Sequence, residues 1–366
     1  MRALAWRSTV AILLVPGAFA LPAAARAQDP APRPTADVLS PPAPVVRTDG
    51  RRHLVYELVV NNPTASSAEL RGLDVLGPDG ESVATFAADA LAGMLVPFGT
   101  TLPAGGLAIV RLDLALPRGR VPGELSHRLA FTLPDGAELT VSGADTTVSR
   151  RAALRVGPPL RGERLVAIIA HTPVTIGGQI SFSQRYAIDF VRLNEAGDDV
   201  FTGDPQRNDS YAIYGSEVIA VADGTIAVAR NDLPENTPPA EPPFTSYDVA
   251  AGNRVVHDLG GGRYALYAHL QPGSLRVSAG ERVRRGQVLG LVGNTGISSG
   301  PHLHFQVMDG AGGPSALDAD GLPYVFHRFG LDGNIADFTA PVIVPAAPPR
   351  EREDQFPLGG DVLGFG

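Results

Sequence analysis

The 366-residue chain contains no cysteine and no lysine. Without cysteine it cannot form disulfides, thiolate zinc sites, iron–sulfur clusters or a cysteine nucleophile. Any metal site must therefore be built from the eight histidines and the carboxylates. Because lysine is absent, all 30 basic residues are arginine.

Basic charge and aromatic side chains are also scarce. The 38 acids outnumber the bases and give a formal charge of −8, which argues against nucleic-acid binding as the main function. Aromatics make up only 6% of the chain, but the hydrophobic content of 44% is too high for a disordered protein. Beyond the N-terminal segment no run is long and apolar enough to predict a membrane span.

The first 27 residues have the pattern of a secretory signal. Arg2 and Arg7 supply a basic start, and an apolar run that is short for a membrane span follows. A small-x-small cleavage site then precedes Gln28. We therefore expect an exported protein, located in the periplasm or outside the cell; an N-terminal anchor helix is the alternative.

Short strand patterns separated by turn residues indicate an all-β chain of two domains. Residues 28–44 are rich in proline and alanine and predict a disordered linker. Residues 45–153 alternate between apolar runs and turns and predict an immunoglobulin-like β-sandwich. Residues 165–338 are again rich in strand patterns, with glycine at most turns. Residues 341–366 show no core pattern and predict a flexible tail.

One loop interrupts the second domain. Residues 232–247 contain five prolines, which exclude a central strand or a helix. Loops of this length often border a binding site.

Two histidines one residue apart form the densest chemical signal. His302 and His304 lie in a strand pattern, so their side chains point to the same face. Two imidazoles on one face near a glycine-rich turn suit metal or acid–base chemistry. Taken alone, the pair is equally consistent with two exposed strand histidines.

The surrounding motifs favour a functional site. The Gly-Pro-His-Leu-His segment ends at His304, and a Tyr-Ala-His-Leu segment contains His269. Between them lies a run of Val-x-x-Gly turns that leads into Gly-Asn-Thr-Gly. With these motifs in this order, residues 213–307 resemble the lysostaphin-type (LytM-type) zinc metallopeptidases, which cut peptides of peptidoglycan. A lipoyl-type carrier domain could share the glycine turns, but it would need a lysine.

The resemblance implies a role for each matched position. It implies that His304 and Asp189 are ligands of one Zn²⁺ ion, and that His302 and His269 are catalytic histidines beside it. It also implies a two-sheet β domain with an open groove. Zinc held by imidazole and carboxylate would lower the pKa of a bound water, and a histidine could then take its proton.

The chain departs from the family pattern at Arg185. The family has a ligating histidine four residues before the aspartate, whereas arginine stays protonated and only donates. Arg185 could instead face the groove and bind a substrate carboxylate.

His171 is a candidate replacement ligand. A turn at Gly177-Gly178 would pair residues 176 and 179 and would set His171 opposite Gln184. A shift of one residue would set it opposite Arg185, on the same face as Asp189. The sequence leaves both registers open.

Two functions follow from these motifs. The first is an exported zinc metalloendopeptidase that hydrolyses peptide bonds of peptidoglycan in cell-wall remodelling; the retained His269, His302, His304 and Asp189 favour it. The alternative is a non-catalytic relative that binds peptidoglycan or activates another cell-wall hydrolase, which the loss of a ligand at Arg185 favours.

Overall fold

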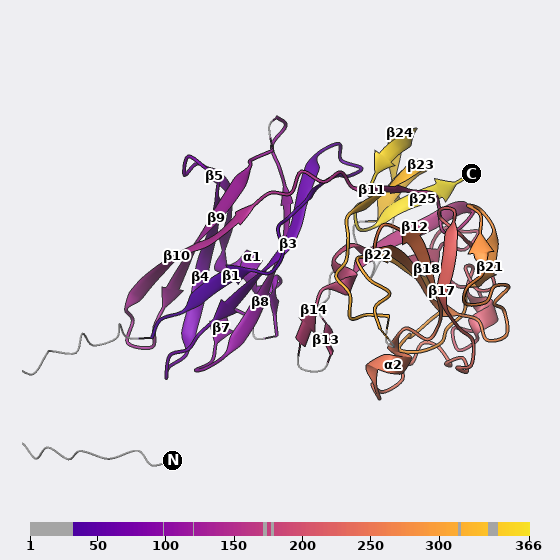
Figure 1. Ribbon diagram of the computed structural model, residues 1–366, viewed down its shortest axis with the longest axis horizontal. Coiled ribbons are helices and arrows are strands. Elements are labelled where there is room, and N and C mark those ends of the chain that lie inside the picture. Colours follow the sequence, from indigo (N-terminus) through magenta and orange to yellow (C-terminus); the bar gives the residue numbers. More distant parts are fainter. Residues whose placement is uncertain are drawn as a thin grey trace, which may run out of the picture.

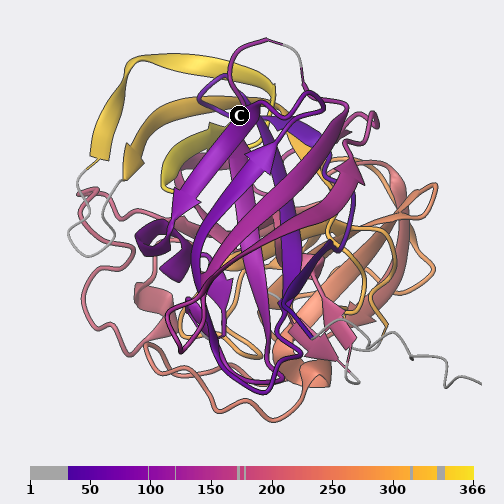
Figure 2. The ribbon, with the colours of Figure 1, turned by 90° about the vertical axis from the view of Figure 1, so that its left-hand side faces the viewer.

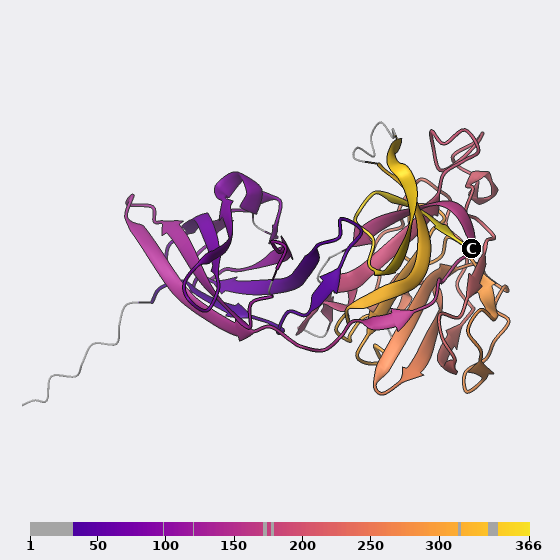
Figure 3. The ribbon, with the colours of Figure 1, turned by 90° about the horizontal axis from the view of Figure 1, so that it is seen from above.

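The computed structural model describes residues 32–97, 99–119, 121–170, 174–176, 179–313, 316–335 and 343–366. The predicted signal sequence and His171 lie outside these residues. The described chain is nearly all β, as predicted. Two β-rich parts lie side by side along the long axis (Figures 1 and 3).

The N-terminal part is a sandwich of two antiparallel sheets (Figure 2). One sheet has the order β1 (Thr35–Val38), β3 (Arg52–Asn61), β8 (Leu107–Ala115) and β6 (Leu95–Val96), with β2 (Pro44–Val46) also paired to β3. The other has the order β10 (Glu138–Thr147), β9 (Glu124–Thr132), β4 (Ala68–Leu76) and β5 (Ser82–Ala87), with β7 (Thr101–Leu102) also paired to β4. A short helix, α1 (Ala88–Ala92), follows β5.

The C-terminal part is built on one large mixed sheet, with eleven strands among the described residues. Its order is β11 (Leu154–Val156), β23 (Tyr324–Ile335), β25 (Asp361–Phe365), β12 (Gly162–Ala170), β15 (Ala187–Arg192), β22 (Leu303–Met308), β19 (Arg263–Leu270), β18 (Asn253–Gly260), β17 (Gly224–Arg230) and β20 (Arg282–Val283), with β24 (Ile343–Gln355) also paired to β23.

Smaller elements complete this part. There are two two-stranded ribbons, β13 (Val174–Ile176) with β14 (Gln179–Ser181) and β16 (Glu217–Ile219) with β21 (Val288–Leu291). Three short helical turns are η1 (Ser183–Tyr186), η2 (Asn208–Ser210) and α2 (Tyr247–Ala250). Within the described chain the second domain therefore contains one large sheet and two small ribbons, so it is an all-β domain with more than one sheet, as predicted.

Two segments predicted to lack structure form strands. Thr35–Val38, inside the expected linker, pairs with β3. The expected tail contributes β24 and β25, and β25 lies between β23 and β12 within the large sheet. The prolines of β24 are tolerated because, among the described residues, this strand pairs with β23 alone and so lies at an edge. The proposed limits of the second domain therefore widen from 165–338 to about 154–365.

The order of strands in the large sheet brings the predicted site residues together. β15 and β19 both pair with β22, and Asp189 and Ala268 lie opposite His304 on either side. The flanking side chains Ile188, Leu303 and Phe305 are completely buried in the core of this part. Among the described residues, no helix is long and apolar enough to cross a membrane.

Candidate functional site

Asp189, His302 and His304 meet at the centre of the large sheet. The Nδ1 atom of His304 lies 2.7 Å from Oδ1 of Asp189. Nε2 of His302 lies 3.7 Å from the same oxygen, so both histidines do point to one face. The side chains of Asp189 and His302 are 28% and 16% exposed, and solutes can therefore reach this point.

His269 packs against both of these histidines. Its ring centroid lies 4.5 Å from that of His302 and 5.9 Å from that of His304. Its φ angle of +62° is unusual for a residue other than glycine. Strained backbone of this kind is often found at functional sites.

Hydrogen bonds to carbonyl groups fix the orientation of two imidazoles. Nδ1 of His269 donates to the carbonyl oxygen of Thr295 at 2.7 Å, and Nδ1 of His302 donates to that of Gly300 at 2.9 Å. A carbonyl can only accept, so Nδ1 carries the proton in both rings. Burial lowers the pKa of His269 well below its usual value, and the neighbouring histidines lower it further. His269 is therefore neutral, and its Nε2 atom carries the lone pair that can accept a hydrogen bond.

The ion pair between His304 and Asp189 has the opposite effect. Burial alone would lower the pKa of His304 and raise that of Asp189. Their mutual attraction outweighs burial, so the pKa of His304 is raised and that of Asp189 is lowered. His304 also donates from Nε2 to the side-chain oxygen of Gln306 at 2.8 Å. Both nitrogens of His304 thus act as donors.

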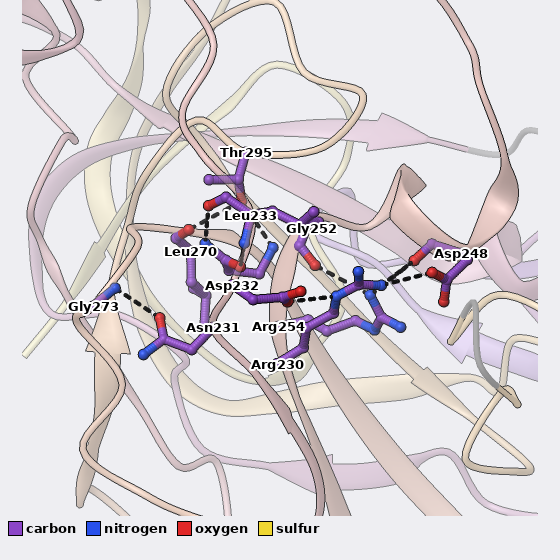
Figure 4. A network of polar contacts seen from close by, with 11 residues as sticks. Arg230, Asn231, Asp232, Leu233, Asp248, Gly252, Arg254, Leu270, Gly273 and Thr295 are labelled. Atoms are coloured by element: carbon purple, nitrogen blue, oxygen red, sulfur yellow. Dashed lines mark hydrogen bonds and ion pairs between the residues drawn. The ribbon is translucent and has the colours of Figure 1, made fainter.

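A polar network behind the site holds Thr295 in place (Figure 4). The Thr295 hydroxyl donates to the carbonyl of Leu270 and accepts from the amide of Asn253. The buried Asn253 side chain bonds both the amide and the carbonyl of Leu233, at 2.9 and 2.8 Å. The proline-rich loop, which begins at this point, is therefore tied to the turn that orients His269.

Arg185 does not join the cluster. Its guanidinium is buried and pairs with Glu57 of the N-terminal sandwich, with Nε–Oε1 and Nη2–Oε2 distances of 2.8 and 2.7 Å. Nη1 donates to the carbonyl of Gly321 at 3.2 Å. Its partner is thus Glu57, a carboxylate of the protein itself, and not the substrate carboxylate that the sequence left possible.

The described residues do not fit the zinc ion that the resemblance implies. They contain no group of three or more His, Asp or Glu side chains arranged to hold a metal. The two remaining ligand candidates, Asp189 and His304, are bonded to each other, and Arg185 offers no lone pair.

The register near His171 is only partly as predicted. Ile176 pairs with Gln179, as expected. The same register would place Ala170 opposite Arg185. Ala170 instead pairs with Ala187, two residues farther along, because η1 interrupts the returning strand. His171 itself lies outside the described residues, so its role stays a prediction.

Three residues important to this arrangement were missed from the sequence: Glu57, Thr295 and Gln306. Glu57 carried a signal, since it is the single acid in the apolar strand pattern of residues 54–60. An acid at such a position calls for a buried partner.

Comparison with known proteins relates part of the chain to a peptidase family. The sequence pattern of peptidase family M23 matches residues 208–316. The chain contains an M23 peptidase domain. The matched segment includes His269, His302 and His304, whereas Asp189 and Arg185 lie before it.

Two named relatives are similar to part of this chain. The peptidoglycan DD-endopeptidase ShyA of Vibrio cholerae is 33% identical over 105 residues, which is 28% of this chain and 20% of that protein. The cell division protein DipM of Caulobacter vibrioides is 35% identical over 108 residues, which is 29% of this chain and 15% of that protein. The similarity thus spans a fifth or less of these relatives.

Among solved structures, the catalytic domain of lysostaphin from Staphylococcus simulans is 23% identical. The alignment covers 43% of this chain and 88% of that domain, with a TM-score of 0.26.

Proposed function

We propose that this protein is exported and recognises peptides of peptidoglycan through its M23 domain, without the zinc-dependent hydrolysis typical of the family. The observation that carries this proposal is the state of position 185. Arginine there cannot ligate a metal, and its charge is already neutralised by Glu57. The sequence alone favoured hydrolysis, and this ion pair favours the alternative.

The remaining cluster is suited to binding a peptide backbone. Asp189 presents a partly exposed carboxylate that accepts from amide N–H groups. His269 offers a neutral acceptor nitrogen at Nε2. Hydrogen bonds to the charged Asp189 carboxylate are stronger than neutral ones and give orientation as well as affinity.

Hydrolysis is the second candidate, because the four retained family positions do lie together. Its requirement is a third metal donor, which no described residue supplies.

Incubation of the purified chain with isolated peptidoglycan sacculi tests the proposal. We expect the protein to sediment with the sacculi and to release no soluble peptide fragments, with or without added Zn²⁺. Asp189→Asn should weaken binding about tenfold, since it removes a charged acceptor worth about 1.4 kcal/mol. Asp209→Asn, at an exposed aspartate outside the cluster, is the matched control.

Zinc-dependent release of fragments that His302→Ala abolishes would overturn the proposal in favour of hydrolysis. Failure to sediment with sacculi would remove the peptidoglycan assignment altogether.

A further inference from the structure

Strand β3 of the N-terminal sandwich is buried on both faces. Its alternate residues Leu54, Tyr56 and Leu58 belong to the core of the sandwich. Val55, on the opposite face, belongs instead to the core of the C-terminal part. Glu57 shares the face of Val55, because side chains alternate along a strand, and it is completely buried.

Glu57 and Arg185 each provide the buried charged group of the other with an oppositely charged hydrogen-bond partner. Burial alone would lower the pKa of Arg185, but the hydrogen bonds and charge of Glu57 raise it, so the guanidinium stays charged. The planar guanidinium meets the carboxylate at two points and also lies over the ring of Phe182, 5.7 Å from its centroid. Breaking a buried pair of this kind is costly because it strands one charge.

A second contact from the sandwich reaches the next residue along the chain. Tyr186 packs edge-on against Phe356, with centroids 5.9 Å apart. The amide of Phe356 donates to the carbonyl of Val46, and the Arg47 guanidinium lies 5.3 Å from the Phe356 ring centroid. The N-terminal domain thus contacts Arg185 directly and Tyr186 through Phe356.

These two residues end the turn η1, which leads directly into β15 and Asp189. Ser183, Arg185 and Tyr186 are buried within η1. Ile188 and Asp189, two and three residues after Tyr186, pair with Phe305 and His304. The path from Glu57 to the polar cluster therefore runs through one buried turn and the start of one strand.

We propose that Glu57 is a positioning residue for the cluster: through Arg185 the N-terminal domain holds the η1 turn, and so sets Asp189 at hydrogen-bond distance from His304. The N-terminal sandwich is then part of the site and not a tethered neighbour. This inference concerns the geometry of the cluster and holds whether the site binds or cleaves its peptide.

The NMR signal of the His304 Hδ1 proton tests it, because a proton shared with a carboxylate resonates far downfield. The signal is assigned by its loss in His304→Gln of the full chain. In Glu57→Gln we expect it to shift or to broaden beyond detection, while the far-ultraviolet circular dichroism stays that of a folded β protein. Glu69→Gln removes a carboxylate from the exposed Arg71–Glu69 pair of the same sandwich and should leave the signal unchanged.

A charge exchange supplies the rescue. Glu57→Arg combined with Arg185→Glu should return the signal toward its wild-type position and also covers the case in which Glu57→Gln does not fold. A folded Glu57→Gln chain with a wild-type signal overturns the inference. So does a charge exchange that restores folding while the signal remains lost.

Discussion

Individual residues of the cluster owe their state to particular neighbours. His269 is a neutral acceptor because Thr295 takes its Nδ1 proton and burial opposes a charge. His304 is a double donor because Asp189 and Gln306 both accept from it. The sequence motifs identified these histidines and Asp189. They could not identify Glu57, since a pair 128 positions apart depends on how two domains dock.

His257 is a buried titratable residue outside the cluster. It is fully buried and stacks on Tyr267, with ring centroids 6.4 Å apart. Neither ring nitrogen has a hydrogen-bond partner among the described residues. Burial lowers its pKa to about 4, although Asp258 and Asp223 act in the opposite direction.

This residue should make the fold sensitive to acid. Above the usual histidine pKa of 6.5, His257 is neutral in both the folded and the unfolded chain. As the pH falls below 6.5, His257 becomes protonated in the unfolded chain but stays neutral in the folded chain. Stability is therefore lost between these two pKa values, by on the order of 3 kcal/mol at full effect. Urea unfolding of wild type and His257→Leu at neutral and acidic pH measures the difference.

The variant should lose less stability on acidification than the wild type by about that amount, whereas His327→Gln, at an exposed histidine, should behave like the wild type. Equal acid sensitivity of His257→Leu and wild type would show that His257 does not carry the effect.

At the scale of elements, local patterns predicted the strands inside the domains better than they predicted the domain boundaries. β8 and β9 lie within residues 45–153, where strands were expected, and every second residue of β9 is buried. The expected tail became β24 and β25 because the large sheet offers them pairing partners. Proline and glycine lower the local preference for a strand, but they do not reveal an available neighbouring strand.

The proline-rich loop was correctly expected to lack a central strand, and it depends on Asn253 for its attachment. Asn253→Ala removes both bonds to Leu233 and should cost about 1–3 kcal/mol of unfolding free energy. Hydrogen exchange of residues 232–246 should then become faster, together with that of the turn at Thr295, which shares the network.

Asn231→Ala is the matched control, because the Asn231 side chain accepts a bond from the amide of Gly273 at the exposed edge of the same network (Figure 4). We expect a much smaller change there. Similar exchange in the Asn253→Ala chain and in wild type would mean that the loop is held by other contacts.

At the scale of the whole molecule, the two domains pack against each other through specific polar contacts. The interface combines the Glu57–Arg185 pair, the Phe356–Val46 hydrogen bond and a bond from Thr48 to the buried Asp361. The family resemblance predicted the arrangement of the second domain, but it carried no information on the first, which lies outside the match. The departure from the family pattern at position 185 was visible in the sequence. Its explanation, the ion pair with Glu57, became visible only from the structure of both domains together.

The central claim is that position 185 serves the domain interface and not a metal. Zinc binding by the purified full chain tests it most directly, by calorimetric titration and by metal analysis after dialysis. We predict no stoichiometric zinc in the wild type. We also predict tighter zinc binding, by about tenfold or more, when Arg185→His is combined with Glu57→Gln, because the pair is removed and a donor is gained.

One tightly bound zinc ion per wild-type chain, lost in both Asp189→Asn and His304→Ala, would contradict the account. The third zinc ligand would then be a residue outside the described part of the chain, and His171 would be the first residue to test by substitution.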